Sequence, residues 1–219
     1  MRKRPVALFG LLVLAVWLQG CAVVNFPISL GKTAEISEFT MESADKTFTL
    51  DKILLLDISG VISAESGGGL LDLSDGNTVA TISDFLDVAR DDNRIKAVIL
   101  RIDSPGGEVT ASDIIYNEIR RFKRDRAEKG QPVKVIAAIL GTGASGGYYI
   151  AQAADAIYIH PTGLTGSIGV MATFPNLSGL TRKIGVDMRI IKSGKHKDAA
   201  SIWRDFSPGD REILEGLID

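Results

Sequence analysis

The sequence predicts an α/β fold with a largely parallel sheet and repeated strand-helix units, and three observations support this. Short, nearly continuous apolar runs recur along the chain, as expected of strands that are covered on both faces. Between these runs, apolar residues repeat at helical spacing. The chain has 219 residues, 45% of them hydrophobic, which suffices for one sizeable core. Strands that alternate with helices around one core favour a parallel sheet in a single domain.

The first elements of this domain are predicted as strand, helix and strand. The apolar run at 52–58 predicts a strand, and the glycine-rich stretch Ser66–Gly69 predicts a loop after it. From 78 to 90 the apolar residues follow helical spacing, and 97–102 is again a strand of the buried type. This order is the repeating unit of a parallel sheet.

A second helix is predicted to begin near Thr110, which forms a capping box with Asp113. The buried stripe of this helix would consist of Ala111, Ile115, Ile119 and Phe122. The pattern then predicts a strand over 133–140, a helix over 145–154, and strands over 156–159 and 188–191.

A last helix is predicted to begin within Ser207–Asp210. Its apolar stripe consists of Ile213, Leu214, Leu217 and Ile218, and the chain ends at Asp219 without a capping signal. We therefore expect the domain that spans 51–219 to be truncated at its C-terminus.

The N-terminus has the composition of an export signal. The basic stretch Met1–Arg4 precedes an apolar run over 5–18, which is short for a bilayer core of roughly 30 Å. Residues 1–20 are therefore predicted to be a cleaved signal peptide, and 21–50 a linker that enters the first strand. The sequence Leu-Gln-Gly-Cys resembles a bacterial lipobox, which makes Cys21 the expected lipidation site. The alternative is an uncleaved anchor, and both place the domain outside the cytoplasm at a bacterial membrane.

Composition excludes several classes of function. The net charge is −2, and without the first 20 residues it becomes −5, so nucleic acid is not an expected partner. The single cysteine excludes an intrachain disulfide. With His160 and His196 as the only histidines, the usual ligands of a zinc site are lacking, and no metal is expected.

Two glycine-rich loops follow predicted strands, where the chemistry of α/β folds collects. In Asp103–Gly107 the glycines allow neighbouring amide groups to form an oxyanion hole. In Gly141–Gly147, Ser145 stands at the start of a helix, whose free N–H groups stabilise negative charge. Taken alone, the first loop could be an ordinary turn, and the second a helix cap or a phosphate cradle.

A serine nucleophile needs a base, and the surroundings of the two histidines do not favour them. A buried lysine loses the advantage of its charged form and can then accept the serine proton as a neutral amine. The segment 191–198 holds Lys192, Lys195 and Lys197, and their spacing does not select one of them. A solvated basic loop is the alternative for this segment.

Four motifs, in order along the chain, resemble the signal peptide peptidase A family, whose members have a crotonase-like (ClpP-like) fold. They are Asp103–Gly107, Ala144–Tyr149 (Ala-Ser-Gly-Gly-Tyr-Tyr), Thr165–Gly169 (Thr-Gly-Ser-Ile-Gly) and Ser193–Asp198 (Ser-Gly-Lys-His-Lys-Asp). The resemblance runs from about Lys52 to the C-terminus.

The resemblance implies a Ser/Lys dyad. Ser145 matches the nucleophile, Lys197 the general base, and Ser167 the serine that orients the lysine amine, with a simple turn serine as the alternative for Ser167. The amides of Gly106 or Gly107, together with that of Gly146, would form the oxyanion hole. No cofactor is needed for this serine endopeptidase chemistry.

The resemblance also implies the biological setting. The expected substrates are remnant signal peptides in the membrane, and the expected assembly is a ring-shaped homo-oligomer in which Ser145 and Lys197 can pair across protomers. Three alternatives are a membrane-associated protease with another substrate, such as a quality-control or propeptide-processing enzyme, a non-catalytic lipoprotein scaffold, and an acyl-CoA enzyme of the crotonase fold. The export signal argues against the last of these.

Overall fold

The computed structural model describes residues 51–65 and 77–218. All described residues belong to one compact unit. The predicted signal peptide, Cys21, the linker and the loop at 66–69 lie outside the described residues. The described elements, in chain order, are β1 (Lys52–Ile62), α2 (Thr78–Asp91), β2 (Ile95–Gly107), α3 (Val109–Glu128), β3 (Lys134–Ala144), α4 (Gly146–Ala151), β4 (Ala156–Ile159), β5 (Leu164–Gly166), α5 (Ser178–Lys183) and α6 (Pro208–Glu215).

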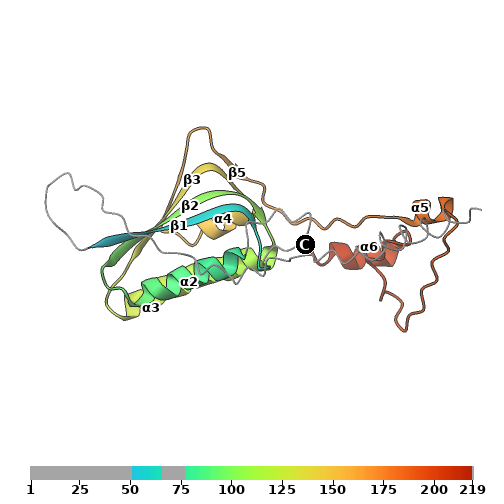
Figure 1. Cartoon of the computed structure of the whole chain (residues 1–219), viewed down its shortest axis with the longest axis horizontal. Helices are drawn as coiled ribbons and strands as arrows, with labels where there is room; N and C mark the ends of the chain where they lie inside the picture. The colour runs from blue at the N-terminus through green and yellow to red at the C-terminus, as the bar shows by residue number, and fades with distance from the viewer. Residues whose placement is uncertain (1–50, 66–76, 219) are drawn as a thin grey trace, which may run out of the picture. The chain divides into compact units, whose positions relative to one another are not determined.

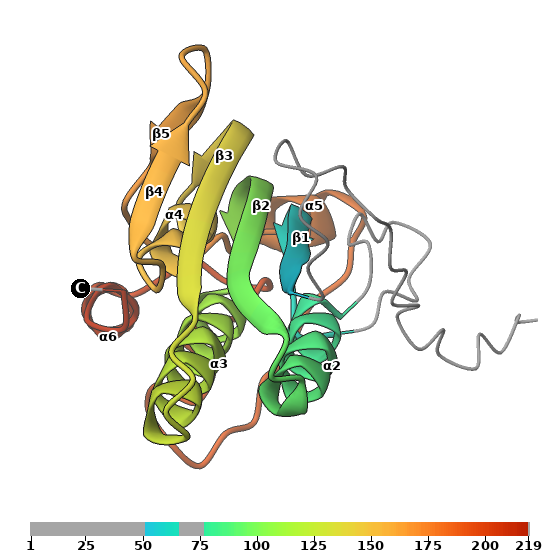
Figure 2. The ribbon, with the colours of Figure 1, turned by 90° about the vertical axis from the view of Figure 1, so that its left-hand side faces the viewer.

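The strands form one parallel sheet in the order β1-β2-β3-β4, and the short β5 pairs with the far end of β3. Helices α2, α3 and α4 connect consecutive strands and lie on one face of the sheet (Figures 1 and 2). The predicted α/β fold with a largely parallel sheet and repeated strand-helix units is confirmed.

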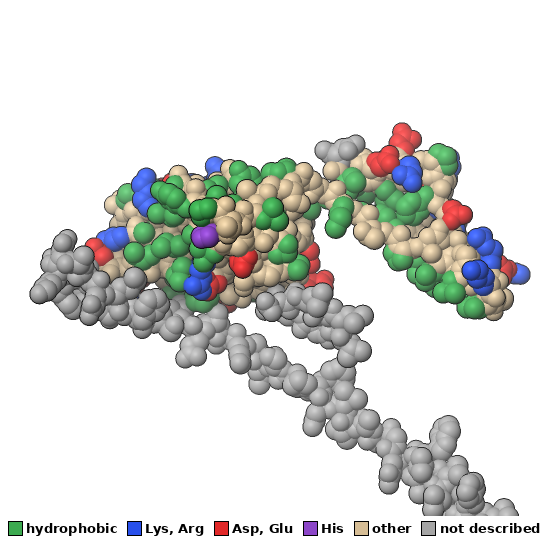
Figure 3. Space-filling view, turned by 90° about the horizontal axis from the view of Figure 1, so that it is seen from above, with side chains coloured by type: hydrophobic (Ala, Val, Ile, Leu, Met, Phe, Trp, Pro, Cys, Tyr) green, Lys and Arg blue, Asp and Glu red, His purple; other side chains and the backbone are tan. Residues whose placement is uncertain are grey.

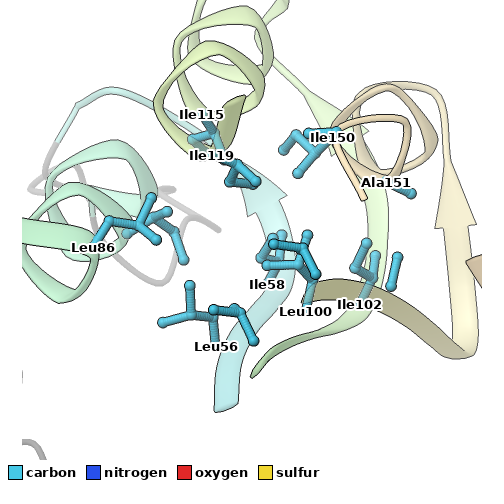
Figure 4. Close-up of a cluster of buried hydrophobic side chains, with 14 of the residues drawn as sticks. Leu56, Ile58, Leu86, Leu100, Ile102, Ile115, Ile119, Ile150 and Ala151 are labelled. Carbon is cyan, nitrogen blue, oxygen red and sulfur yellow. The ribbon is translucent and has the colours of Figure 1, made fainter. Parts of the chain in front are cut away.

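The core lies between this face of the sheet and the helices. Figure 4 shows Leu56 and Ile58 of β1 and Leu100 of β2 pointing toward Leu86 of α2 and Ile119 of α3. All the buried hydrophobic residues among those described lie between Leu56 and Ala153. The core therefore comes from the sheet-helix units alone.

The opposite face of the sheet differs from the expectation of strands that are covered on both sides. Ile53 and Leu55 of β1 are 61% and 39% exposed, whereas Leu56 and Ile58 are buried. Hydrophobic side chains are spread over the face seen in Figure 3. The apolar run of β1 is thus covered on one side only by the residues that the structure describes.

Three predictions about helix ends and stripes have different outcomes. The buried stripe of α3 is confirmed, because Ala111, Ile115, Ile119 and Phe122 are all buried. The capping box at Thr110 is wrong: the N-cap is Glu108, two residues earlier, and it makes no side-chain cap. The start of α6 is confirmed, since the Ser207 side chain accepts from the Asp210 N–H in a complete capping box.

Two strand predictions also need correction. Residues 188–191 form no strand, because this exposed stretch has no strand partner among the described residues. Conversely, β5 was not predicted, since three residues between Gly163 and Ser167 carry no recognisable apolar pattern. Within the described ranges, no helix combines the length and apolar character needed to cross a membrane.

Candidate active site

The two predicted glycine-rich loops are the ends of neighbouring strands. Asp103–Gly107 continues β2 and Gly141–Ala144 continues β3, with Ser104 paired to Gly143. The prediction of loops at these positions is therefore wrong in its secondary structure. The two segments nevertheless follow neighbouring strands as predicted, because β2 and β3 are adjacent and parallel and their carboxyl ends meet at one edge of the sheet.

Ser145 lies on the turn between β3 and α4, in a strained conformation. Its φ is +49° and its ψ is −119°, and its side chain is half-buried. Ser145 and Ser167 are the only residues other than glycine with positive φ in the described part of the chain. Such strain persists only where the surroundings enforce it, and a sharp strand-to-helix turn is one way to present a serine nucleophile.

Strand β5 brings Ser167 beside Ser145. In the parallel pairing of β3 with β5, Ala144 is opposite Gly166, so the residues that follow them, Ser145 and Ser167, leave the ladder side by side. The Ser145 N–H donates to the Gly166 carbonyl at 2.8 Å, and Thr165 Oγ1 donates to the Gly143 carbonyl at 2.9 Å. A strand of three residues thus joins two of the sequence-predicted site residues.

Gly106 and Gly146 pack against the same turn. Gly106 has φ +103°, and a Cβ at this position would lie 2.8 Å from both the Cβ of Ser145 and the N atom of Gly146. A Cβ at Gly146 would lie 2.3 Å from Ser112 Oγ of α3. Only glycine fits at these two positions, and Gly106 packs directly against Ser145 and Gly146.

The predicted base lies in a different part of the chain. Lys197 is exposed, in the stretch between α5 and α6, and no hydrogen bond or ion pair among the described residues joins it to Ser145. Lys192 is engaged elsewhere, because its ammonium group pairs with the Asp198 carboxylate and donates to the Lys195 carbonyl.

The two histidines have other partners. His196 Nδ1 lies 2.8 Å from a carboxylate oxygen of Asp210, and His160 Nδ1 lies 2.9 Å from Thr162 Oγ1. No hydrogen bond of the described residues links either ring to Ser145. Within the described ranges there is also no group of three or more histidine, cysteine or acidic residues that could hold a metal ion.

Comparison with known proteins gives consistent similarities. Residues 127–219 match the sequence pattern of peptidase family S49. A Synechocystis protein provisionally named protease slr0021 is 34% identical over 174 residues, which are 80% of this chain and 56% of that protein. Protease 4 of Haemophilus influenzae is 39% identical over 140 residues, covering 62% of this chain and 20% of the relative. The chloroplastic serine protease SPPA of Arabidopsis thaliana is 39% identical over 127 residues, covering 58% and 18%.

The chain is similar to peptidase family S49, and residues 127–219 carry the match. The resemblance predicted from four ordered motifs is thereby confirmed, and the matched region includes Ser145, Ser167 and Lys197. The chain spans about half the length of the first two relatives, at 56% and 51%.

Two solved structures resemble the chain more weakly. A mutant of the 1510-N membrane-bound stomatin-specific protease, in complex with a substrate peptide, has a TM-score of 0.44 at 22% identity and covers 57% of this chain and 48% of that one. A mutant of ClpP1 from Listeria monocytogenes has a TM-score of 0.33 at 23% identity, covering 48% and 55%.

Ser104 was not among the site residues predicted from the sequence. Its side chain is fully buried, and its hydroxyl donates to the Gly60 carbonyl at 2.6 Å and accepts from the Gly106 N–H at 3.1 Å. Ser104 thus connects β1 to the strained Gly106. The signal was present in the motif Asp-Ser-Pro-Gly-Gly, whose glycines alone were interpreted.

Asp103, from the same motif, was also missed. Its carboxylate accepts from the Thr142 N–H at 2.8 Å and so ties the end of β2 to the approach to Ser145 on β3. A Cβ at Gly141 would lie 2.7 Å from this carboxylate, which explains the glycine there. The motif's two polar residues therefore tie the end of β2 to both neighbouring strands, Ser104 to β1 and Asp103 to β3.

The Ser104 contact helps to decide which glycine amide can serve a substrate. The Gly106 N–H is already bonded to Ser104, and the Glu108 N–H donates to the Ile62 carbonyl of β1 at 2.9 Å. Ile62 is opposite Gly107 in the pairing of β1 with β2, and its carbonyl is taken by the Glu108 N–H rather than by that of Gly107. This favours Gly107 over Gly106 as the second donor beside Gly146.

Proposed function

We propose that the protein is an exported, membrane-anchored serine endopeptidase that cleaves remnant signal peptides with a Ser145/Lys197 dyad. The observation that carries this proposal is the strained turn at Ser145, packed against Gly106 and Gly146 at the carboxyl end of two parallel strands. Similarity to peptidase family S49 supports a peptidase reaction at this turn.

The chain's own groups account for each step of the reaction. Ser145 Oγ attacks the substrate's peptide carbonyl and transfers its proton to the neutral Lys197 amine. The amides of Gly107 and Gly146 bind the oxyanion. Lys197 gives its proton to the substrate's leaving amine, and water then hydrolyses the acyl-enzyme. No cofactor takes part. Ser167, held beside Ser145 by β5, orients the lysine amine.

Lys197 reaches the site from a second protomer in this proposal. Its segment makes no hydrogen bond or ion pair with Ser145 within the part of the chain that the structure describes, whereas Ser145, Ser167 and the glycines are already together. A homo-oligomer would complete each site with the lysine of a neighbour.

The substrate and membrane parts of the proposal rest on the N-terminal sequence. An export signal over 1–20 and a lipidated Cys21 would hold the enzyme at the membrane surface outside the cytoplasm. Apolar signal peptides that remain in the membrane after precursor processing are the substrates within reach of such an anchor.

The test uses the full protein in detergent, with a fluorophosphonate probe for the serine and two peptides of equal length as substrates. One peptide is an apolar signal sequence and the other is a polar sequence. We expect probe labelling and cleavage of the signal peptide, both lost in Ser145→Ala and strongly reduced in Lys197→Ala, while Lys195→Ala stays active as the matched lysine control.

Other outcomes would redirect the proposal. Full activity in Lys197→Ala would exclude it as the base. Faster cleavage of the polar peptide would point to another substrate. A correctly assembled protein that neither reacts with the probe nor cleaves either peptide would favour a non-catalytic lipoprotein scaffold.

A further inference from the structure

A cluster of polar side chains surrounds the backbone of Lys197. We name it the Arg204 cluster. Its members are Lys192, His196, Asp198, Arg204, Ser207 and Asp210.

Arg204 binds two carboxylates at once. Its Nε and Nη2 donate to the two carboxylate oxygens of Asp198, each at 2.8 Å, in a bidentate pair. Its Nη1 donates to the Asp210 carboxylate at 2.7 Å, and its Nη2 also reaches the Asp198 carbonyl at 3.0 Å. The guanidinium fixes both the side chain and the backbone of the residue that follows Lys197.

Asp210 fixes the residue that precedes Lys197. This carboxylate is 1% exposed and lies 2.8 Å from His196 Nδ1, while it also accepts from the N–H and the hydroxyl of Ser207 at 3.0 and 2.7 Å. The Arg204 guanidinium, with His196 and Ser207, holds the pKa of Asp210 well below its usual range, so the carboxylate stays charged. His196 and Asp198 are thereby tied to one another through Arg204 and Asp210.

Apolar packing does not supply this anchoring. In the described residues after 167, the buried ones are Ser178, Thr181 and Asp210, none of them hydrophobic. A lysine side chain has four rotatable bonds, and its amine can be placed only if the backbone beneath it is held. The Arg204 cluster is what holds that backbone on both sides.

We infer that Arg204 is a positioning residue, which holds the 196–198 backbone so that the Lys197 amine reaches the serine. This inference rests on the proposed function, because it requires Lys197 to be the base. Arg204 itself touches no reacting atom. Its removal should therefore slow acylation of Ser145 and leave substrate binding nearly unchanged.

The experiment is a double-mutant cycle in the full protein, with Arg204→Met and Lys197→Ala alone and together. We measure kcat and KM on the signal peptide and the rate of fluorophosphonate labelling of Ser145. For Arg204→Met we expect kcat and the labelling rate to fall by roughly 10- to 100-fold, since small misplacement of a catalytic group costs this much. KM should change by less than about 2-fold, and in the Lys197→Ala background Arg204→Met should cause no further loss.

The matched control is Arg211→Met. Arg211 is exposed on α6 and pairs only with Glu215, at 3.2 Å, among the described residues. The Arg211→Met variant should keep the wild-type kcat. If Arg204→Met fails to fold or assemble, Asp198→Asn removes the same bidentate pair with a smaller change and should give the same split between kcat and KM.

Three results would overturn the inference. Wild-type kcat in Arg204→Met with a strongly impaired Lys197→Ala would reject the role of Arg204 and leave the proposed dyad intact. An equal loss from Arg204→Met with and without Lys197 would assign Arg204 to general stability. Full activity in Lys197→Ala would reject the base itself, and this inference with it.

Discussion

The two predicted catalytic residues are held in place in opposite ways. Ser145 stands at the edge of a buried core, on a turn enforced by ladder hydrogen bonds and by glycines that admit no side chain. Lys197 stands in a stretch without a buried hydrophobic residue, where the Arg204 cluster supplies the order. The nucleophile is thus preorganised by packing, and the base by charge.

Two arginines illustrate the same difference between the buried core and the charged cluster. Arg126 of α3 is 1% exposed, and its guanidinium donates to backbone carbonyls, among them those of Asp92 at 2.8 Å and Ile95 at 3.0 Å. Arg204 is 28% exposed and binds the carboxylates of Asp198 and Asp210. Partly exposed ion pairs weaken with salt and acid, whereas buried hydrogen bonds to carbonyls do not titrate. The part of the site that carries Lys197 should therefore be the part that responds to salt and to pH.

The largest expected effect comes from Gly106→Ala. The new Cβ would lie 2.8 Å from the Cβ of Ser145 and from the Gly146 N atom, so the turn and the predicted oxyanion donors must move apart. We expect kcat to fall by about 100-fold or more, the loss typical when one oxyanion donor is removed. Fluorophosphonate labelling of Ser145 and peptide cleavage measure it.

Gly130→Ala is the matched control for this prediction. Gly130 also has positive φ, at +70°, but a Cβ there would meet nothing within 4 Å. The control carries the same kind of backbone strain and should cost only about 1 kcal/mol of stability, with activity unchanged. If both variants lose activity equally, strain and not contact with Ser145 explains the result.

The next effect is on stability and belongs to the core. Arg126→Met removes the donors to the carbonyls of Ala89 and Ile95, whose hydrogen bonds to Arg126 are buried. Each such group costs roughly 1–3 kcal/mol, so we expect a loss of about 3 kcal/mol in the free energy of unfolding. Urea unfolding followed by circular dichroism measures it.

Arg124→Met, on the same helix, serves as the control. Arg124 is exposed, and its replacement should stay within about 0.5 kcal/mol of the wild type. Arg204→Met should spare the core transition that Arg126→Met lowers. If it lowers that transition as much, the two regions are not independent in the way proposed.

The same contrast determined how much could be predicted from the sequence. The sheet-helix units were predicted because burial imposes periodicity, as in the α3 stripe Ala111, Ile115, Ile119 and Phe122. Where order comes from polar contacts between residues distant in sequence, no periodicity marks it. Strand β5 and the Arg204 cluster were missed for this reason, and the exposed apolar stretch 188–191 was mistaken for a strand.

The candidate site was predictable only in part. Ser145, Ser167 and the glycines were predicted from motifs, and the structure brings them together. The motif contains Ser104, but its partner could not be predicted, because the Gly60 carbonyl that it binds belongs to a strand 44 positions earlier. The role of Lys197 stays a prediction.

The smallest effect is the response to acid, and it should affect only the part of the site that carries Lys197. The pKa of Asp198 and that of Asp210 are lowered well below their usual range, in both cases mainly by Arg204. A lowered folded pKa stabilises the folded form above the unfolded value of about 3.9, and this contribution is lost as the pH falls below it. Asp92, at the end of α2, has a lowered pKa as well, but the buried hydrophobic cluster does not titrate. A protein that begins at Ala22 keeps Trp203 as its only tryptophan, since Trp17 lies in the predicted signal peptide. We expect Trp203 fluorescence to change below about pH 4 while the far-ultraviolet circular dichroism of the sheet and helices persists to lower pH, and Arg204→Met should move the fluorescence change to higher pH. Simultaneous loss of both signals would mean that the Arg204 cluster and the core unfold as one unit.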